Sequence, residues 1–128
     1  MLKLSRMRRS IAVAAFALSV IATSTVSGHH GWEGYLRADF QLTGTVESTV
    51  TTAGAHASLK VNVDGQVWNV VLAPPARTER AGLKSGMIPV GATVTAYGHR
   101  HRDPKTFEIK TERLRWNDRV FNVYPDRT

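Results

Sequence analysis

Residues 57–72, ASLKVNVDGQVWNVVL, decide the fold of this chain. The first half, ASLKVNV, alternates apolar and polar side chains, which is the period of a strand with one buried face. Asp64-Gly65 follows as a two-residue turn, because a type I′ hairpin needs positive φ at both of its central positions. The second half, QVWNVVL, is almost continuously apolar and predicts a partner strand that is buried on both sides. The stretch therefore predicts an antiparallel hairpin.

Further strands are predicted on both sides of this hairpin. Upstream, residues 40–50 alternate in the same way, with Gly44 inside them as a bulge or bend. Pro74-Pro75 ends the second hairpin strand, and the charged stretch 76–83 is the one predicted helix. Three more strands are predicted downstream, at residues 92–97, 106–116 and 119–124.

This order of elements predicts an all-β fold. Five or six strands with a short helix between the third and the fourth match a small barrel of the oligonucleotide/oligosaccharide-binding (OB) type. An open antiparallel sheet or a small sandwich is the alternative. We expect residues 40–128 to form this single β-barrel domain, preceded by an exposed His-rich leader at residues 29–39.

Residues 1–28 have the features of a cleavable secretory signal peptide. A basic start without acidic residues precedes an apolar run at residues 11–22, which is shorter than the ~20 residues that a membrane-spanning helix needs. Cleavage after Gly28 would release a protein that begins at His29, and cleavage one residue earlier would leave Gly28 in front of it. We therefore expect a periplasmic or secreted protein without a transmembrane segment after processing.

Charge and cysteine content narrow the function classes. The formal net charge of +7 includes the four cations of the signal peptide, so the processed chain carries +3. The chain has no cysteine, which excludes a disulfide, a thiolate metal site and a cysteine nucleophile. No serine lies in a nucleophile elbow and no glycine-rich loop opens a helix, so an enzyme is not expected.

Several short motifs resemble one family of small secreted bacterial proteins of unknown function. They span nearly all of the processed chain: His29-His30-Gly31-Trp32, Gly44-Thr45-Val46, His56, Trp68, Leu72-Ala73-Pro74-Pro75, Arg80-Ala81-Gly82-Leu83, Tyr97-Gly98-His99-Arg100 and Tyr124-Pro125-Asp126-Arg127. The family pattern has Asn-Pro before the central histidine, whereas this chain has Gly54-Ala55 before His56. The resemblance implies an exported barrel-like domain and no established activity.

The histidines predict a copper site. Cleavage after Gly28 would give His29 a free α-amine beside its own imidazole and that of His30, a nitrogen set that favours tetragonal Cu(II). The earlier cut would also allow a square plane of nitrogens. His56 or His99, or else His101, would supply a further nitrogen; zinc is a lesser option. The alternative interpretation is that the histidine pair is a solvated tail.

A second prediction concerns anions. The densest cationic stretch, residues 97–105, and the strand after it supply four candidate anion-binding side chains: Arg100, Arg102, Arg113 and Arg115. Their expected partner is an anionic component of the cell envelope, such as a glycan or a lipid headgroup. Nucleic acid is not expected, because an exported domain does not usually meet it. A plain solvated face is the alternative.

The sequence therefore favours an exported barrel protein that binds copper through its processed N-terminus. A binding module whose basic face contacts an anionic envelope partner is the alternative function. A structural envelope protein without a small ligand is the third interpretation.

Overall fold

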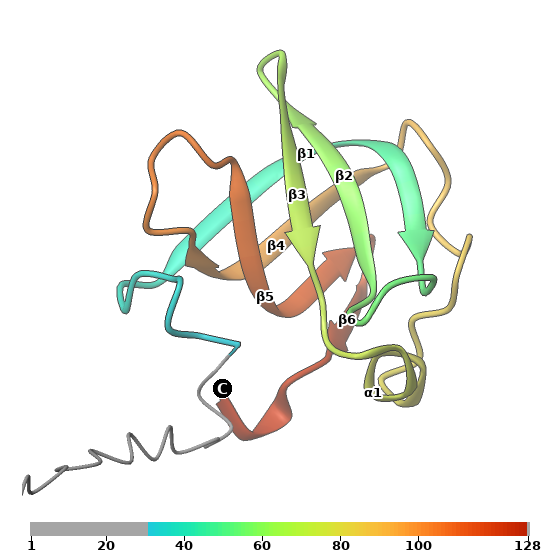
Figure 1. Ribbon diagram of the computed structural model, residues 1–128. Coiled ribbons are helices and arrows are strands. Elements are labelled where there is room, and N and C mark those ends of the chain that lie inside the picture. Colours follow the sequence, from blue (N-terminus) through green and yellow to red (C-terminus); the bar gives the residue numbers. More distant parts are fainter. Residues whose placement is uncertain (1–30, 128) are drawn as a thin grey trace, which may run out of the picture.

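The computed structural model describes residues 31–127, which form six strands, one α-helix and one short 3-10 helix (Figure 1). The predicted signal peptide, His29 and His30 lie outside the described residues. The elements are β1 (Phe40–Thr51), β2 (Ser58–Val63), β3 (Gln66–Val71), α1 (Pro75–Arg80), β4 (Thr93–Arg100), β5 (Glu108–Trp116), β6 (Arg119–Asn122) and the 3-10 helix η1 (Pro125–Arg127).

The six strands form one sheet in the order β3-β2-β1-β4-β5-β6. Neighbouring strands in this order are antiparallel. A parallel pairing between β3 and β5, in which Asn69 lies opposite Glu108, joins the two sides of the sheet and closes a five-stranded barrel, with β6 as an additional strand. The prediction of a small all-β barrel with one short helix is confirmed.

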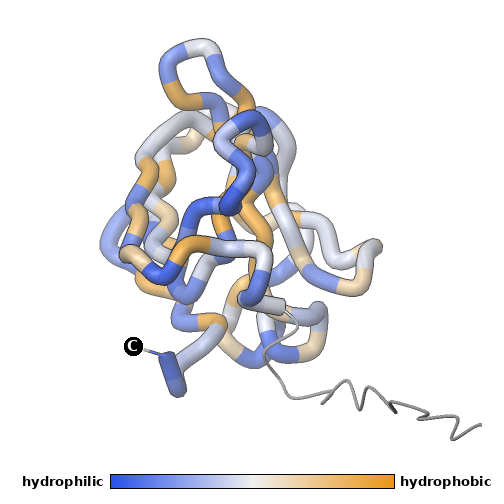
Figure 2. The backbone as a smooth tube through the Cα atoms, turned by 60° about the vertical axis from the view of Figure 1, so that its left-hand side comes forward, coloured by the Kyte–Doolittle hydropathy of each residue, from blue (hydrophilic) through white to orange (hydrophobic). Residues whose placement is uncertain are grey.

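Apolar side chains from β1 to β6 fill the interior of the barrel. Figure 2 shows the corresponding alternation of hydrophilic and hydrophobic residues along the backbone. The largest side chains with almost no exposed surface are Phe121, Leu59, Leu72, Leu83, Ile88, Ile109 and Leu114. Burial of one such side chain is worth about 1.5–3 kcal/mol, so the interior is the main source of stability.

The predicted turn at Asp64-Gly65 is present. Both residues have positive φ, 50° for Asp64 and 86° for Gly65, as the type I′ turn requires. The prediction of a bulge at Gly44 is wrong in position, because Gly44 pairs regularly with Val94 and the register shift lies beyond Val46. A β-carbon at Gly44 would collide with the carbonyl oxygen of Asn62, so glycine allows close approach of two strands there.

The leader segment, residues 31–36, docks on the barrel beside the end of β4. Tyr35 forms an isolated bridge with His101, and the Leu36 amide donates to the Arg100 carbonyl at 2.8 Å. Most side chains from residue 31 to residue 39 are exposed, but Trp32 and Tyr35 are half-buried. The leader is therefore held by the sheet rather than extended into solvent. Among residues 31–127, no helix combines the length and apolar character that a membrane span requires.

Candidate functional site

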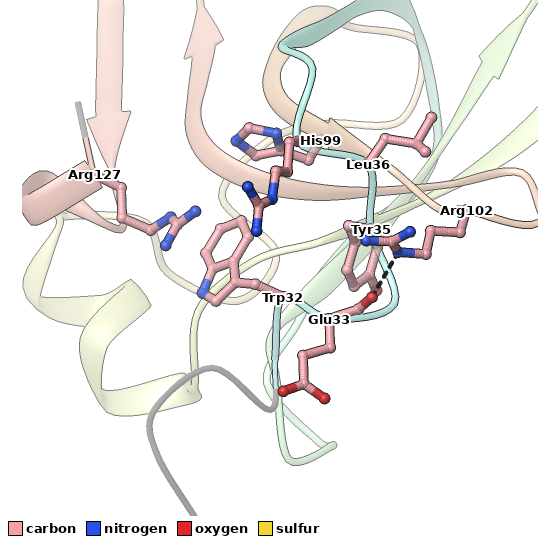
Figure 3. Close-up of a pocket in the computed structure, with 8 residues that line it drawn as sticks. Trp32, Glu33, Tyr35, Leu36, His99, Arg102 and Arg127 are labelled. Atoms are coloured by element: carbon pink, nitrogen blue, oxygen red, sulfur yellow. Dashed lines mark hydrogen bonds between the residues drawn. The ribbon is translucent and has the colours of Figure 1, made fainter.

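A pocket opens where the leader segment meets the C-terminal residues (Figure 3). Its volume is about 610 Å³. The lining comes from the leader segment, from the end of β4 with the loop after it, and from η1: Trp32, Glu33, Tyr35, Leu36, Arg37, His99, Arg102 and Arg127. We call it the Trp32 pocket. Three separate parts of the chain must fold together to build it.

Trp32 lies among two cationic and two aromatic side chains. The Arg127 guanidinium carbon is 3.8 Å from the indole centroid, and the Lys110 ammonium nitrogen is 5.5 Å from it. The rings of Tyr124 and His99 meet the indole edge-on, with centroids 5.1 and 5.7 Å away. Cation–π contacts of this kind contribute about 0.5–2 kcal/mol each. Trp32 therefore anchors the leader segment to the end of the barrel.

The arginines of the Trp32 pocket have few protein partners. Arg37 makes no hydrogen bond, ion pair or ring contact within residues 31–127. Arg102 uses only Nε, which donates to the Glu33 carbonyl at 2.8 Å. Arg127 places Nε 3.4 Å from Glu112 Oε1, which is long for a charge-assisted hydrogen bond. Most of the guanidinium donors in the pocket thus remain available to a ligand.

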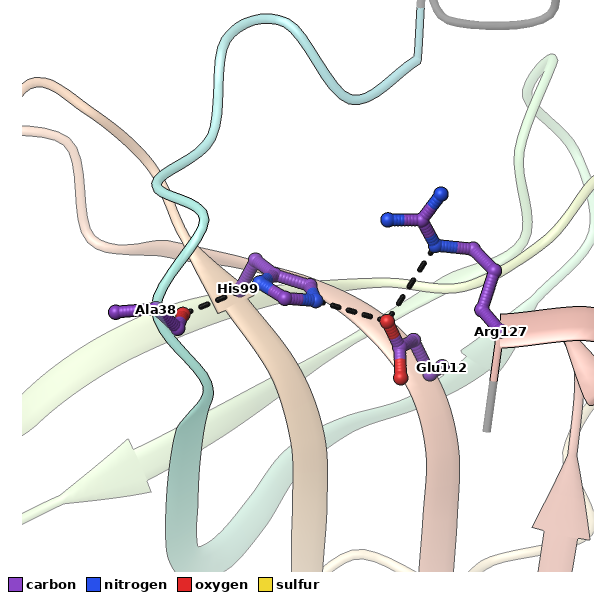
Figure 4. A network of polar contacts seen from close by, with 4 residues as sticks. All are labelled: Ala38, His99, Glu112 and Arg127. Carbon is purple, nitrogen blue, oxygen red and sulfur yellow. Dashed lines mark hydrogen bonds and ion pairs between the residues drawn. The ribbon is translucent and has the colours of Figure 1, made fainter.

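His99 takes part in a buried network below the pocket (Figure 4). Its Nδ1 lies 3.1 Å from the Ala38 carbonyl oxygen, and its Nε2 lies 2.8 Å from Glu112 Oε1. Only 8% of His99 is exposed. Both ring nitrogens are engaged by oxygen acceptors, so a metal would have to displace one of them. This geometry gives His99 a structural role and removes the basis for its prediction as a metal ligand.

His56 lies in the loop between β1 and β2, near the buried Lys110. Burial lowers the pKa of the His56 imidazole, and the charge of Lys110 lowers this pKa further. Burial also lowers the pKa of the Lys110 ammonium, although Glu108 partly opposes the shift. A β-carbon built at Gly31 would lie 3.4 Å from Lys110 Nζ. The first described residue of the chain and His56 are therefore both neighbours of Lys110.

Only two of the four predicted copper ligands fall within the structure. His56 and His99 are described, whereas His29 and His30 precede the described residues. Residues 31–127 contain no group of three or more His, Cys, Asp or Glu placed to hold a metal ion.

The four predicted anion-binding arginines do not line one described pocket. Arg100 lies over an aromatic cluster, 4.5 Å from the Trp68 ring centroid, and Arg113 lies 4.6 Å from that of Tyr97. Arg115 is exposed and lines none of the described pockets. Only Arg102 reaches the Trp32 pocket. Arg113 lines a second hollow, which Arg127 also lines. One basic face that holds all four arginines stays a prediction.

Sequence reasoning did not single out Arg37 and Arg127, which line the Trp32 pocket. Arg127 belongs to a motif that the sequence already singled out, Tyr124-Pro125-Asp126-Arg127, as does Trp32 in the histidine-rich motif. Those two motifs lie more than 90 residues apart in the sequence, and no local pattern indicates that they meet. Their proximity follows only from closure of the barrel.

Comparisons with known proteins bear on the fold alone. No family model matches this chain, and no curated protein matches it. A solved structure of a ZRD-deleted mutant of TiaS in complex with agmatine is similar, with a TM-score of 0.51 and 14% identity over 66% of this chain and 26% of that chain. Apo TiaS, a tRNA agmatidine synthetase, gives a TM-score of 0.48 and 16% identity over 61% of this chain and 18% of the other. The chain thus spans about a quarter of these proteins or less. The match to the ZRD-deleted mutant, at 14% identity, indicates a shared fold only.

Proposed function

We propose that the protein is an exported copper-binding carrier or sensor. His29 and His30 would hold Cu(II) after removal of the signal peptide, and His56 would be the third ligand. The docked leader segment is the observation that carries this proposal. It fixes Gly31 against Lys110, and His56 is a neighbour of the same ammonium group.

Covalent geometry keeps the two terminal histidines near this end of the barrel. Consecutive Cα atoms are about 3.8 Å apart, so the Cα of His29 cannot be more than about 7.6 Å from that of Gly31. The α-amine and both imidazoles are therefore tethered to a residue whose position the barrel determines. Because Gly31 is already held in place, less conformational entropy is lost when the terminal histidines and His56 bind the same metal ion.

The protonation state of His56 also favours metal binding. Its lowered pKa keeps the imidazole neutral at pH 7, and neutral imidazole is the form that binds a metal. The ammonium of Lys110 would repel a copper ion, but burial lowers the Lys110 pKa and so reduces the cost of deprotonating it. His99 is left out of the proposed ligand set, because both of its ring nitrogens are engaged.

The test compares two histidine variants of the natively processed protein. We expect His56→Ala to change the nitrogen hyperfine pattern in the electron paramagnetic resonance spectrum of the Cu(II) complex and to weaken copper affinity at least tenfold. His101→Ala is the matched control, because His101 is a half-buried imidazole beside Tyr35 at the other end of the leader segment. Its spectrum and affinity should equal those of the wild type.

Two results would overturn the copper site. If the His56→Ala and His101→Ala proteins have the same spectrum, copper is held by the terminal chelate alone. If mass spectrometry of the native secreted protein finds two or more residues still present before Gly28, neither His29 nor His30 is within the first three residues, and the α-amine is too far from the imidazole pair to join the chelate.

The proposed role is binding rather than catalysis. The tRNA named for the structural neighbours belongs to proteins several times longer, so it does not extend to this chain. An exported domain would also be separated from tRNA by the membrane. We keep nucleic acid outside the proposed set of partners for this reason.

A further inference from the structure

The Trp32 pocket concentrates positive charge that the protein itself does not neutralise. Within residues 31–127 only two ion pairs form, and both use Glu112. Most other arginines with a defined contact lie over aromatic rings, namely Arg77, Arg100, Arg113 and Arg119. Arg37 and Arg102 have neither kind of partner, and both line the same pocket.

The carboxylates near the pocket do not balance this charge. Glu33 is the one acidic residue of the lining and makes no ion pair in the described part of the chain. Glu112 is committed to His99 at 2.8 Å and is only 3.4 Å from Arg127 Nε. Three guanidiniums of like charge therefore share one hollow, and a bound anion would relieve their repulsion.

The size and the lining of the pocket fit a ligand that is larger than a simple anion. A volume of about 610 Å³ exceeds the space that a single phosphate or carboxylate fills. Tyr35 and Leu36 give the pocket ring-sized apolar surface, while the Tyr35 hydroxyl is already bonded to Glu108. The indole Nε1 of Trp32 has no hydrogen-bond partner within residues 31–127, so it can donate to a ligand hydroxyl.

We infer that the Trp32 pocket binds an acidic sugar, a single sugar ring that carries a carboxylate or a phosphate. Arg37 and Arg102, which have no ion pair, bind the charged group, because the planar guanidinium fork matches the oxygens of either group. Arg127 lies over Trp32 and borders the hollow on the other side. The ring packs on Tyr35 and Leu36, and its hydroxyls accept from Trp32. In Figure 3, Arg127 and Arg102 approach Trp32 and Tyr35 from opposite sides of this hollow.

This site is independent of the proposed copper site. None of its residues is a proposed copper ligand, and acidic-sugar binding should persist in the presence of a chelator. Failure of one proposal therefore leaves the other intact.

Calorimetric titration of metal-free, natively processed protein at low salt tests the inference. The probes are galacturonate and glucose 6-phosphate, with galactose and inorganic phosphate as the uncharged and ringless controls. We expect at least one acidic sugar to bind, galactose not to bind, and inorganic phosphate to bind at least tenfold more weakly than that sugar. The Trp32 indole N–H resonance should shift on addition of the acidic sugar.

A charge-matched pair of variants locates the binding. The combined Arg37→Gln and Arg102→Gln substitutions should weaken acidic-sugar binding at least tenfold. The combined Arg80→Gln and Arg115→Gln substitutions, which also remove two exposed charges but lie outside the Trp32 pocket, should change it less than twofold. An unchanged indole N–H spectrum of the free Arg37→Gln and Arg102→Gln protein would show that the pocket remains folded.

Each alternative result contradicts the inference in its own way. Equal binding of inorganic phosphate and the acidic sugars would make the pocket a simple oxyanion site. Equal losses in the two double variants would indicate diffuse surface attraction. The absence of binding to both acidic sugars would overturn the site altogether.

Discussion

At the scale of single residues, Tyr35 joins the leader segment to the barrel. Its hydroxyl donates to Glu108 Oε2 at 2.5 Å, and the other oxygen of Glu108 accepts from Asn69 Nδ2 at 2.9 Å. Burial raises the pKa of the Tyr35 hydroxyl well above its usual value of 10, and the neighbouring Glu108 raises it further. One phenol thereby connects the leader, β3 and β5.

Removal of this hydroxyl should destabilise the protein. We expect Tyr35→Phe to lower the free energy of unfolding by about 1–2 kcal/mol at pH 7, since the lost hydrogen bond ends on a charged group. Above pH 10 the unfolded chain loses the Tyr35 proton, whereas the folded protein retains it. The contribution of the Tyr35 hydroxyl to the free energy of unfolding is therefore fully present below pH 10 and is lost as the pH rises beyond it. Urea denaturation at pH 7 and above pH 10 measures both effects.

Tyr97→Phe is the control for this experiment. The Tyr97 ring packs under Arg113, and its hydroxyl makes no hydrogen bond in the described part of the chain. The substitution should leave stability within about 0.5 kcal/mol of the wild type. Equal losses in the two variants would contradict the role assigned to the Tyr35 hydroxyl.

At the scale of elements, β4 and β5 cross closely at Gly98. A β-carbon there would collide with the backbone of Lys110, and the register between the two strands shifts next to this position. We expect Gly98→Ala to lower the free energy of unfolding by about 3 kcal/mol or more, because backbone atoms cannot move aside as a flexible side chain can. Thermal and urea unfolding measure this loss.

Gly34→Ala provides the comparison for that substitution. A β-carbon at Gly34 would meet nothing nearer than 4.0 Å, and the residue does not have positive φ. Its stability should therefore match that of the wild type. If both alanine variants unfold alike, the close crossing at Gly98 is not a constraint on the fold.

Element boundaries were largely predictable from the sequence because each depends on nearby residues. The alternation of apolar and polar residues predicted which face of each strand is buried, and Asp64-Gly65 predicted the turn of the first hairpin. The helix begins at Pro75, one residue earlier than predicted, since proline is tolerated in the first turn. The position of the register shift in β1 was not predictable, because it depends on contact between strands rather than on local preference.

The candidate sites were less predictable than the strands. Arg100 and Arg113 looked free of partners in the sequence, yet Arg100 lies over the Trp68 ring of β3 and Arg113 lies over the Tyr97 ring of β4. His99 looked like a ligand, yet Glu112 and the Ala38 carbonyl occupy its nitrogens. In every case the deciding partner is distant along the chain, so only the folded structure reveals it.

At the scale of the whole molecule, the leader segment should be held less firmly than the closed barrel. The Leu36 amide donates to the Arg100 carbonyl at the edge of the fold, whereas the Asn69 amide donates to the Phe107 carbonyl where β3 meets β5. Trp32→Ala removes the anchor of the leader. The substitution should speed hydrogen exchange at the Leu36 amide at least tenfold. A tenfold change in exchange rate corresponds to a loss of only about 1.4 kcal/mol in the free energy of local opening.

Exchange at Asn69 serves as the internal reference for this measurement. Its rate should remain within about threefold of the wild type, because the barrel closes without Trp32. Parallel acceleration at Leu36 and Asn69 would mean that the leader and the barrel open together, contrary to the arrangement described above.

The β3–β5 pairing also has a consequence for how quickly the chain can fold. Asn69 and Glu108 are 39 residues apart, so the seam between them forms only after a long segment has been ordered. Topologies dominated by such distant pairings fold in about milliseconds to seconds, slower than helical bundles of similar size. Until the seam forms, both strands present unpaired edges, and self-association should compete with folding during that interval.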